Sequence, residues 1–208
     1  MPPLMVFVIA SIALLLTPGP AVLYIVTRSI DQGRMAGFAS VAGIHIGTMV
    51  HVIGAVAGLS ALLASSALAF SIVKYLGAAY LIYLGIRKII EKPVEADEIA
   101  VKPERDLSAA FRQGVIVNVL NPKTALFFLA FLPQFVDPAK GSAALQILFL
   151  GSVFVILGIC SDGMYAALAG TFGAWLRSSR TFLFGQRYFA GSIYIALGAV
   201  TAVAGHRK

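Results

Sequence analysis

The chain has little charge and almost no cysteine. Of its 208 residues, 12% are Asp, Glu, Lys or Arg and 59% are hydrophobic, with a mean hydropathy of +0.90. One soluble core of this size does not hide so much apolar surface, which excludes a water-soluble domain. The single cysteine, Cys160, excludes an internal disulfide, a dithiol redox pair and a Cys-based zinc cluster. Nine acidic against sixteen basic residues give a net charge of +7. In so apolar a chain we expect the Lys and Arg residues to lie at a membrane boundary rather than to bind nucleic acid.

The uncharged runs predict an all-α membrane protein with six transmembrane helices. A span needs about 20 apolar residues. The uncharged run 35–73 is long enough for two helices and has a break at 64–67. The predicted spans are 4–27, 37–63, 68–87, 113–135, 145–172 and 186–205. The first lacks a basic start and is longer than the apolar stretch of a signal peptide, so we expect the mature protein to retain it.

Lys and Arg are unequally divided between the two sides of this predicted bundle. One side carries Arg28, Arg34, Arg87, Lys88, Lys92, Lys102, Arg105, Arg112, Arg177, Arg180 and Arg187, and the other carries Lys74, Lys140, Arg207 and Lys208. The positive-inside rule places the richer side in the cytoplasm and both termini outside it. Residues 91–110 are predicted to be a cytoplasmic linker, and a partner-binding role for them stays open.

The two halves of the chain, 1–90 and 111–208, resemble each other. Leu16-Thr17-Pro18 and Leu120-Asn121-Pro122 are separated by an offset of 104, and Lys74–Ala79 parallels Arg187–Ser192 at an offset of 113. Each half holds three predicted spans, an odd number, so the second half enters the membrane inverted. Two inverted three-helix repeats are the plan of many secondary transporters, whose binding site lies at the midplane.

Both repeats contain a proline motif that predicts a broken helix. Thr17 and Asn121 are good N-cap residues, and a proline follows each, where its missing N–H costs nothing. Thr17-Pro18-Gly19-Pro20 and Asn121-Pro122-Lys123 therefore predict half-helices that start inside the membrane. Their free N–H groups suit a carboxylate, and the carbonyls of the preceding half-helices suit an ammonium group. An amino acid carries both groups, although two packing kinks would explain the same prolines.

Two charged residues fall near the middle of predicted spans. Lys123 and Asp162 each cost about 2.5 to 3.5 kcal/mol to insert. One interpretation is a structural ion pair between them. The other is that Asp162 takes up and releases a proton during transport, while Lys123 assists the substrate carboxylate or tunes that acid. Tyr165, one turn beyond Asp162, is predicted to hydrogen-bond into the same cavity.

The second predicted span carries a stripe of small residues. Gly43, Gly47, Gly54 and Gly58 share one helix face with His51, a pattern typical of close helix packing. His51 and His45 are interpreted as packing or hydrogen-bonded histidines rather than proton carriers. Their spacing of six is poor for joint metal ligation, so we predict no metal site.

Taken together, the ordered motifs resemble the LysE/RhtB family of amino-acid exporters. They are Thr17-Pro18-Gly19-Pro20, Tyr75-Leu76-Gly77-Ala78-Ala79-Tyr80-Leu81 with Leu84-Gly85, Asn121-Pro122-Lys123 followed by Phe131-Leu132-Pro133-Gln134-Phe135-Val136, and Asp162 with Tyr165. The resemblance implies a multi-pass protein of the bacterial inner membrane that exports amino acids or their derivatives, driven by the proton gradient. It does not determine which amino acid is the substrate or whether the protein forms a homo-oligomer.

We therefore predict a secondary transporter, with no catalytic residues and no cofactor. Its partners are an amino acid, protons and the lipid bilayer, and not nucleic acid. The predicted substrate-binding and translocation residues are Thr17, Pro18, Gly19, Pro20, Tyr24, Asn121, Pro122, Lys123 and Tyr165, with Asp162 for proton coupling. Export of another solute or of a metal cation is the alternative, although a metal-cation site requires several carboxylate, Cys or Met ligands. A membrane-embedded enzyme and a purely structural membrane protein are the remaining alternatives.

Overall fold

The computed structural model describes residues 3–65, 67–90, 106–178 and 180–203, and within them it is all-helical. The elements are α1 (Pro3–Leu15), α2 (Pro20–Gln32), α3 (Arg34–Ser65), α4 (Ala67–Ile90), α5 (Leu107–Val119), α6 (Pro122–Leu126), η2 (Phe127–Phe131), η3 (Leu132–Phe135), η4 (Pro138–Lys140), α7 (Ala143–Ser178) and α8 (Arg180–Val203). Most of the predicted linker lies outside the described residues. Its last residues, from Leu107, already belong to α5, whose N-terminus is capped by the Asp106 carboxylate.

The predicted first and fourth spans are each broken into two helices. α1 and α2 meet at 50°, and α5 meets the segment from Pro122 to Phe135 at 46°. At the second break the cap is the predicted one, because the Asn121 side chain accepts a hydrogen bond from the Lys123 N–H and Pro122 follows it. At the first break the N-cap is Gly19, with Pro20 after it, and not Thr17. The prediction for Thr17 was wrong because the motif holds two prolines, and the helix starts at the second.

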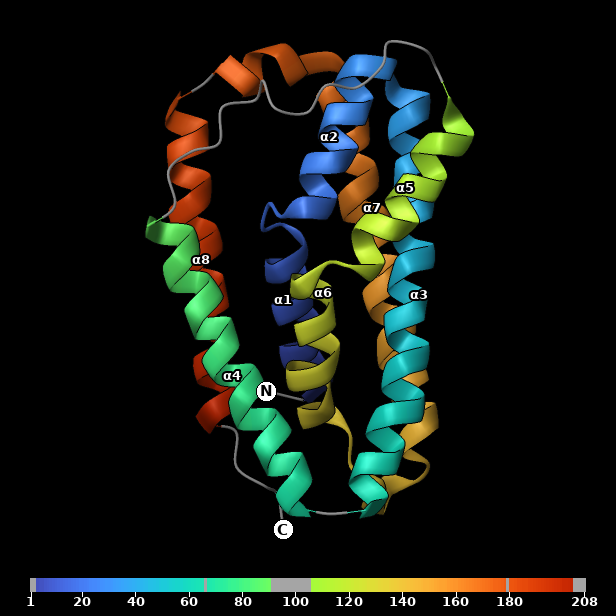
Figure 1. The fold of residues 1–208 in the computed structure, drawn as a ribbon, viewed down its shortest axis with the longest axis vertical. Helices are drawn as coiled ribbons and strands as arrows, with labels where there is room; N and C mark the ends of the chain where they lie inside the picture. Colours follow the sequence, from blue (N-terminus) through green and yellow to red (C-terminus); the bar gives the residue numbers. More distant parts are fainter. Residues whose placement is uncertain (1–2, 66, 91–105, 179, 204–208) are drawn as a thin grey trace.

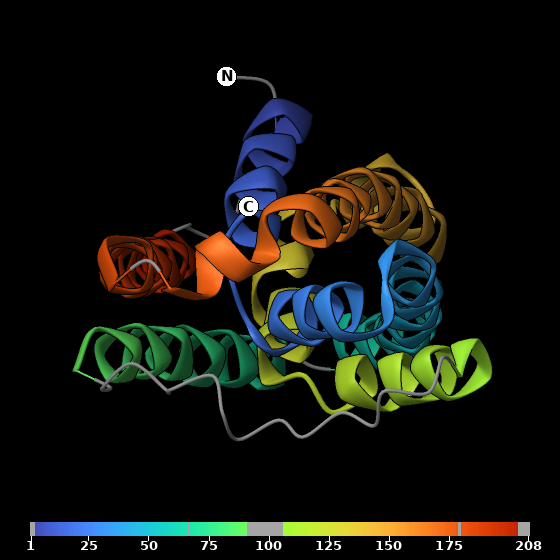
Figure 2. The ribbon, with the colours of Figure 1, turned by 90° about the horizontal axis from the view of Figure 1, so that it is seen from above.

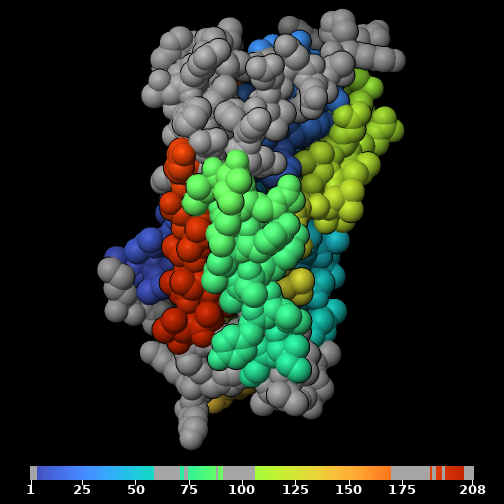
Figure 3. Space-filling model, turned by 60° about the vertical axis from the view of Figure 1, so that its left-hand side comes forward, coloured from blue at the N-terminus to red at the C-terminus, as the bar shows by residue number. Residues whose placement is uncertain are grey.

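Length and composition identify membrane-crossing segments in four places. Two single helices, Arg34–Gly58 and Ala143–Ala169, are long and apolar enough to cross a membrane, and each of the two bent pairs passes the same test when counted as one span. The outer surface agrees with a lipid environment. Figure 3 shows α4 and α8 on one outer face, and α4 exposes Ile72, Tyr75, Leu76, Tyr80, Tyr83 and Ile86.

The helices form two groups with α1 and α6 between them. α4 and α8 pack as a pair on one side, and α2, α3, α5 and α7 gather on the other (Figures 1 and 2). Phenylalanine rings of η2, α1 and α7 fill the centre; Phe127 lies 5.7 Å from Phe7 and 4.6 Å from Phe154, centroid to centroid. At the two breaks, Thr17 and Asn121 are buried against other helices. In lipid, such cover is the condition for leaving backbone groups outside a regular helix.

Only half of the predicted glycine stripe packs against another helix. A methyl group at Gly43 would lie 2.0 Å from the Phe111 carbonyl oxygen, and one at Gly47 would lie 2.8 Å from that of Val115, so α3 and α5 approach closely and run parallel. At Gly54 and Gly58 an added methyl group meets no atom within 4 Å. The packing prediction was wrong for these two because α5 ends before it reaches them.

Candidate functional site

The Lys123 ammonium group lies at the break of the first span. α6 carries this side chain into the C-terminal end of α1, where Nζ donates hydrogen bonds to the carbonyls of Leu14 at 3.1 Å and Thr17 at 2.8 Å. Lys123 is only 6% exposed. A cation is favoured at this position, because the unpaired carbonyls at a helix C-terminus carry partial negative charge. Lys123 therefore joins the two breaks, one from each half of the chain.

Two other carbonyls near the end of α1 also have partners. The Thr17 hydroxyl donates to the Ala13 carbonyl at 2.7 Å, and the Tyr165 hydroxyl of α7 donates to the Leu16 carbonyl at 2.9 Å. We predicted that these half-helix carbonyls would bind a substrate ammonium group. In this structure Lys123 and Tyr165 donate to three of them, the carbonyls of Leu14, Thr17 and Leu16, and binding of a substrate ammonium group at the half-helix ends stays a prediction.

The N-terminus of α2 lies beside the same ammonium group and is uncapped. No side chain bonds to its first turn, Pro20 has no N–H, and the N–H groups of Ala21 and Val22 have no partner within the helix. A methyl group placed on Gly19 would lie 3.3 Å from Lys123 Nζ. An unpaired helix N-terminus and a cation therefore adjoin each other in a buried place, an arrangement that attracts an anion. The start of α6, by contrast, is capped by Asn121.

Asp162 of α7 pairs with a histidine and not with Lys123. Its Oδ2 lies 3.2 Å from Nε2 of His45 on α3, and the two side chains are 5% and 6% exposed. The interpretation of Lys123 and Asp162 as one structural ion pair was therefore wrong. The Asp162 carboxylate still acts electrostatically on both Lys123 and Tyr165, so all three belong to one polar region.

The two histidines of α3 have different surroundings. His51 Nε2 lies 2.8 Å from the Asn118 carbonyl oxygen, and its ring stacks on Phe128. His45 has no aligned hydrogen bond at either ring nitrogen, although Nε2 faces the carboxylate. A buried polar group without a hydrogen bond costs about 1 to 3 kcal/mol. His51 thus fits the predicted structural role, and His45 does not.

Asn118 is the centre of a buried polar cluster that the sequence analysis missed. Its amide group donates to the Ile44 carbonyl and to the Thr48 hydroxyl, both at 2.8 Å. Its side-chain oxygen accepts from the Asn121 amide and the Thr124 hydroxyl. The cluster ties α3 to α5 and α6 at the second break. The signal in the sequence was a second asparagine three residues before the Asn-Pro pair, inside a predicted span.

Replacing Asn118 with leucine is expected to destabilise the protein. The change would leave several buried polar groups without partners, at about 1 to 3 kcal/mol each. For a chain of this size, 1 kcal/mol lowers the melting temperature by about 2 to 4 °C. Thermal unfolding in detergent measures the shift. Gln134→Leu is the control, because the Gln134 amide bonds only to the Ala130 carbonyl one turn away. An equal loss in both variants would contradict a special role for the cluster.

Comparison with known proteins supports the resemblance to exporters. The family model for the LysE type translocator matches residues 12–205. The chain belongs to this family. It is 33% identical over 201 residues to the homoserine/homoserine lactone efflux protein of Salmonella typhimurium, covering 96% of each chain. It is 31% identical to an uncharacterized membrane protein of Vibrio cholerae, with 95% of each covered, and 29% identical to a leucine efflux protein of Salmonella typhimurium, with 74% of this chain covered. No solved structure matches.

The Tyr24 hydroxyl of this translocator bonds to α5 and not to Lys123. The hydroxyl donates to the Ala110 carbonyl of α5 at 2.8 Å. The buried Arg28 guanidinium lies over the Tyr24 ring and donates to Gln113, also on α5. These contacts connect α2 to α5 one turn after another. The structure therefore places the Tyr24 hydroxyl in a contact between α2 and α5.

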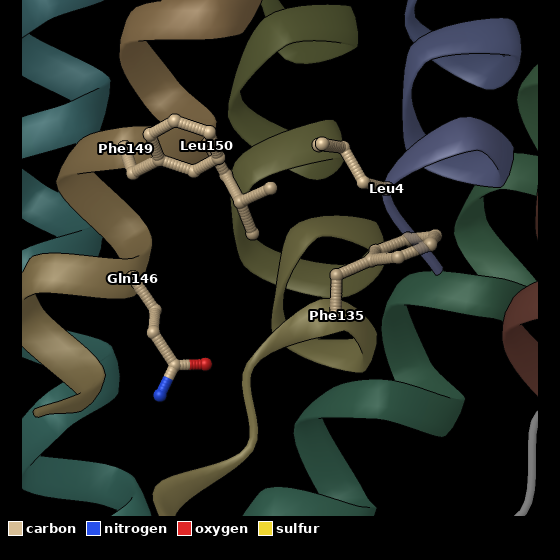
Figure 4. Close-up of a pocket in the computed structure, with 5 residues that line it drawn as sticks. All are labelled: Leu4, Phe135, Gln146, Phe149 and Leu150. Atoms are coloured by element: carbon tan, nitrogen blue, oxygen red, sulfur yellow. The ribbon is translucent and has the colours of Figure 1, made fainter. Parts of the chain in front are cut away.

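A pocket of about 280 Å³ lies elsewhere in the translocator. Figure 4 shows its lining residues, Leu4, Phe135, Gln146, Phe149 and Leu150, at the start of α1, the end of η3 and the start of α7. The lining is apolar except for Gln146, whose amide is bonded to Asp137 and Gly141. None of the predicted site residues lines it. Among the described residues, no group of three His, Cys, Asp or Glu is placed to hold a metal ion.

Proposed function

We propose that this chain exports amino acids or amino-acid derivatives across the bacterial inner membrane, driven by the proton gradient. The observation that carries the proposal is the Lys123 ammonium group at the broken first span, next to the uncapped start of α2. Membership of the translocator family supports the reaction, and the names of the relatives, which include homoserine and leucine efflux, support the class of cargo.

The substrate carboxylate binds between Lys123 and the first turn of α2. Nζ uses two of its three N–H bonds on the Leu14 and Thr17 carbonyls, which leaves one donor for a carboxylate oxygen. The N–H groups of Ala21 and Val22 supply the second set of donors. Hydrogen bonds to charged groups contribute about 1.5 to 3 kcal/mol each, and more of this is retained where water is excluded.

Six spans in two inverted repeats provide the alternating access. Support comes from reciprocal contacts between α4 and α8. A methyl group at Gly85 would lie 2.6 Å from Ile195 Cγ1, and one at Gly198 would lie 2.7 Å from Ile82 Cγ1. The predicted offset of 113 exchanges these two contacts, because it relates Gly85 to Gly198 and Ile82 to Ile195. Two halves related by a two-fold axis between α4 and α8 would produce such an exchange.

In the proposed cycle, rocking of the repeats opens the Lys123 region first to the cytoplasm and then to the outside. Both termini lie outside the cytoplasm in this arrangement, because the Arg-rich ends face the cytoplasm. Asp162 couples the cycle to protons by taking one up when the site faces outward and releasing it inside. The inverted arrangement allows both openings without a second binding site.

Export from living cells tests this function. Cells that overexpress the chain and are fed dipeptides are expected to release the matching amino acid, and to tolerate toxic levels of it, more than cells with an empty vector. Homoserine, threonine and leucine are the first cargoes to measure in the medium. The corresponding amino-acid amides, which lack the carboxylate, are expected not to compete for export from loaded vesicles. Equal competition by the amides would overturn the proposed carboxylate site, and no release of any amino acid would overturn the function.

A further inference from the structure

We propose that His45 and Asp162 form one proton-binding site, in which a single proton is shared between the imidazole and the carboxylate. The proposal deepens the proposed function and rests on it, because proton coupling was there assigned to Asp162 alone. It replaces the interpretation of His45 as a structural histidine. The site joins α3 and α7, the two helices that are long and apolar enough to cross a membrane unbroken.

The geometry distinguishes His45 from a histidine that only fills space. Nε2 faces Asp162 Oδ2 at 3.2 Å, yet neither ring nitrogen has an aligned hydrogen bond. Nδ1 is buried without any partner, so the polar contact that the structure shows for this ring is the one between Nε2 and Asp162. Gly158 provides the space, since a methyl group there would lie 2.4 Å from the His45 ring. The ring is thus accommodated by α7 but not bound by hydrogen bonds.

The charges around the pair oppose the binding of a second proton. Lys123 of α6 acts on Asp162 as a nearby cation, so a doubly protonated pair would place two cations in one buried region. Near the pair, Tyr165 of α7 and Tyr24 of α2 both pack against a buried cluster that includes Ile25 and Ile44. The buried Arg28 of α2 is a second cation in this part of the molecule, and its guanidinium lies over the Tyr24 ring and donates to Gln113. α1 and η2 contain no ionisable side chain. From α5, Arg112 is exposed, and α4 and α8 lie beyond α1 and α6 (Figure 2).

An imidazole is the side chain that titrates between about pH 5 and 8, the range in which a proton gradient operates. In the pair, one proton would move between His45 Nε2 and Asp162 Oδ2, which lie 3.2 Å apart.

The first test compares His45→Gln and Asp162→Asn in proteoliposomes, with His51→Gln as the matched control on the same helix. Export driven by a pH gradient and exchange of substrate at equal pH are both measured. We expect both site variants to lose at least about tenfold in gradient-driven export and to show a flat pH profile from 6 to 8, while exchange is retained. His51→Gln keeps the profile of the natural chain. A natural pH profile in His45→Gln, or the same loss in His51→Gln, would overturn the proposal.

The second test does not depend on transport or on the folding of a His45 variant. The chain has three histidines, so the His51→Gln, His206→Gln double variant leaves His45 as the only imidazole for ¹⁵N NMR. Its titration midpoint is expected to move by more than about one pH unit when Asp162→Asn is added. An unchanged midpoint would overturn the shared site. Absence of any amino-acid transport by the natural chain would instead overturn the proposed function, and the NMR result would still decide whether the pair binds one proton.

Discussion

Replacing Lys123 with methionine is expected to abolish most of the export activity. Methionine keeps the length and apolar stem of the side chain but removes the ammonium group that joins the two helix breaks. The substrate carboxylate then loses a charge-assisted hydrogen bond worth about 1.5 to 3 kcal/mol, which corresponds to a fall of about 10- to 150-fold in affinity. The Leu14 and Thr17 carbonyls also lose the ammonium group that now satisfies them. Initial rates of export from preloaded vesicles at several substrate concentrations measure the loss.

Lys140→Met is the matched control for this variant. Lys140 lies in η4 with its side chain 71% exposed and pairs with Asp137 at 3.3 Å, so its removal changes the charge by the same amount at a surface site. Exposed pairs of this kind contribute about 0 to 1 kcal/mol. We expect natural rates in Lys140→Met. A Lys123→Met protein that folds and exports at the natural rate would eliminate Lys123 from the binding site.

Replacing Gly43 with alanine is expected to cause the largest loss of stability among single methyl additions on α3. The new methyl group would lie 2.0 Å from the Phe111 carbonyl oxygen, which is backbone and cannot rotate away, so α3 and α5 must separate. Overpacking of this kind costs about 1 to 3 kcal/mol, which corresponds to a drop of about 2 to 12 °C in melting temperature. The separation would also pull Asn118 away from Ile44 and Thr48.

Gly54→Ala is the control on the same helix. A methyl group there meets no atom, and alanine is the better helix former, so its melting temperature is expected to stay the same or rise. Thermal unfolding of both variants in the same detergent makes the comparison. Equal stability of the two variants would mean that α3 and α5 lie farther apart than in the structure.

The two helix breaks were predictable because proline acts locally. A proline removes one N–H and collides with the preceding turn wherever it stands in a helix, so Pro18, Pro20 and Pro122 had to interrupt their spans. The cap at Asn121 followed from the same local rule. The exact start of α2 did not, because Pro18 and Pro20 both satisfy the rule for a first helical residue, and only the surrounding packing decides between them.

The partners of the buried charges were not predictable. Lys123 and Asp162 were identified as costly residues inside spans, and the simplest expectation was that they pair with each other. Instead Lys123 bonds to carbonyls more than a hundred residues away, and Asp162 faces His45. Every residue has a backbone carbonyl, so the sequence does not identify which one a helix break leaves unpaired. Whether such a carbonyl bonds to a buried cation depends on where the break lies relative to the other helices.

Composition and local backbone chemistry therefore determined that this chain belongs in a membrane, where its helices break and which charged residues are costly. Tertiary structure alone decided which group satisfies each of them, which glycines touch another helix and which histidine faces an acid. The physical reason is the distance along the chain over which each effect acts. The apolar runs and prolines act within one or two helical turns, whereas hydrogen bonds and ion pairs require two atoms within about 3 Å, and only the packing of helices distant in sequence brings such atoms together.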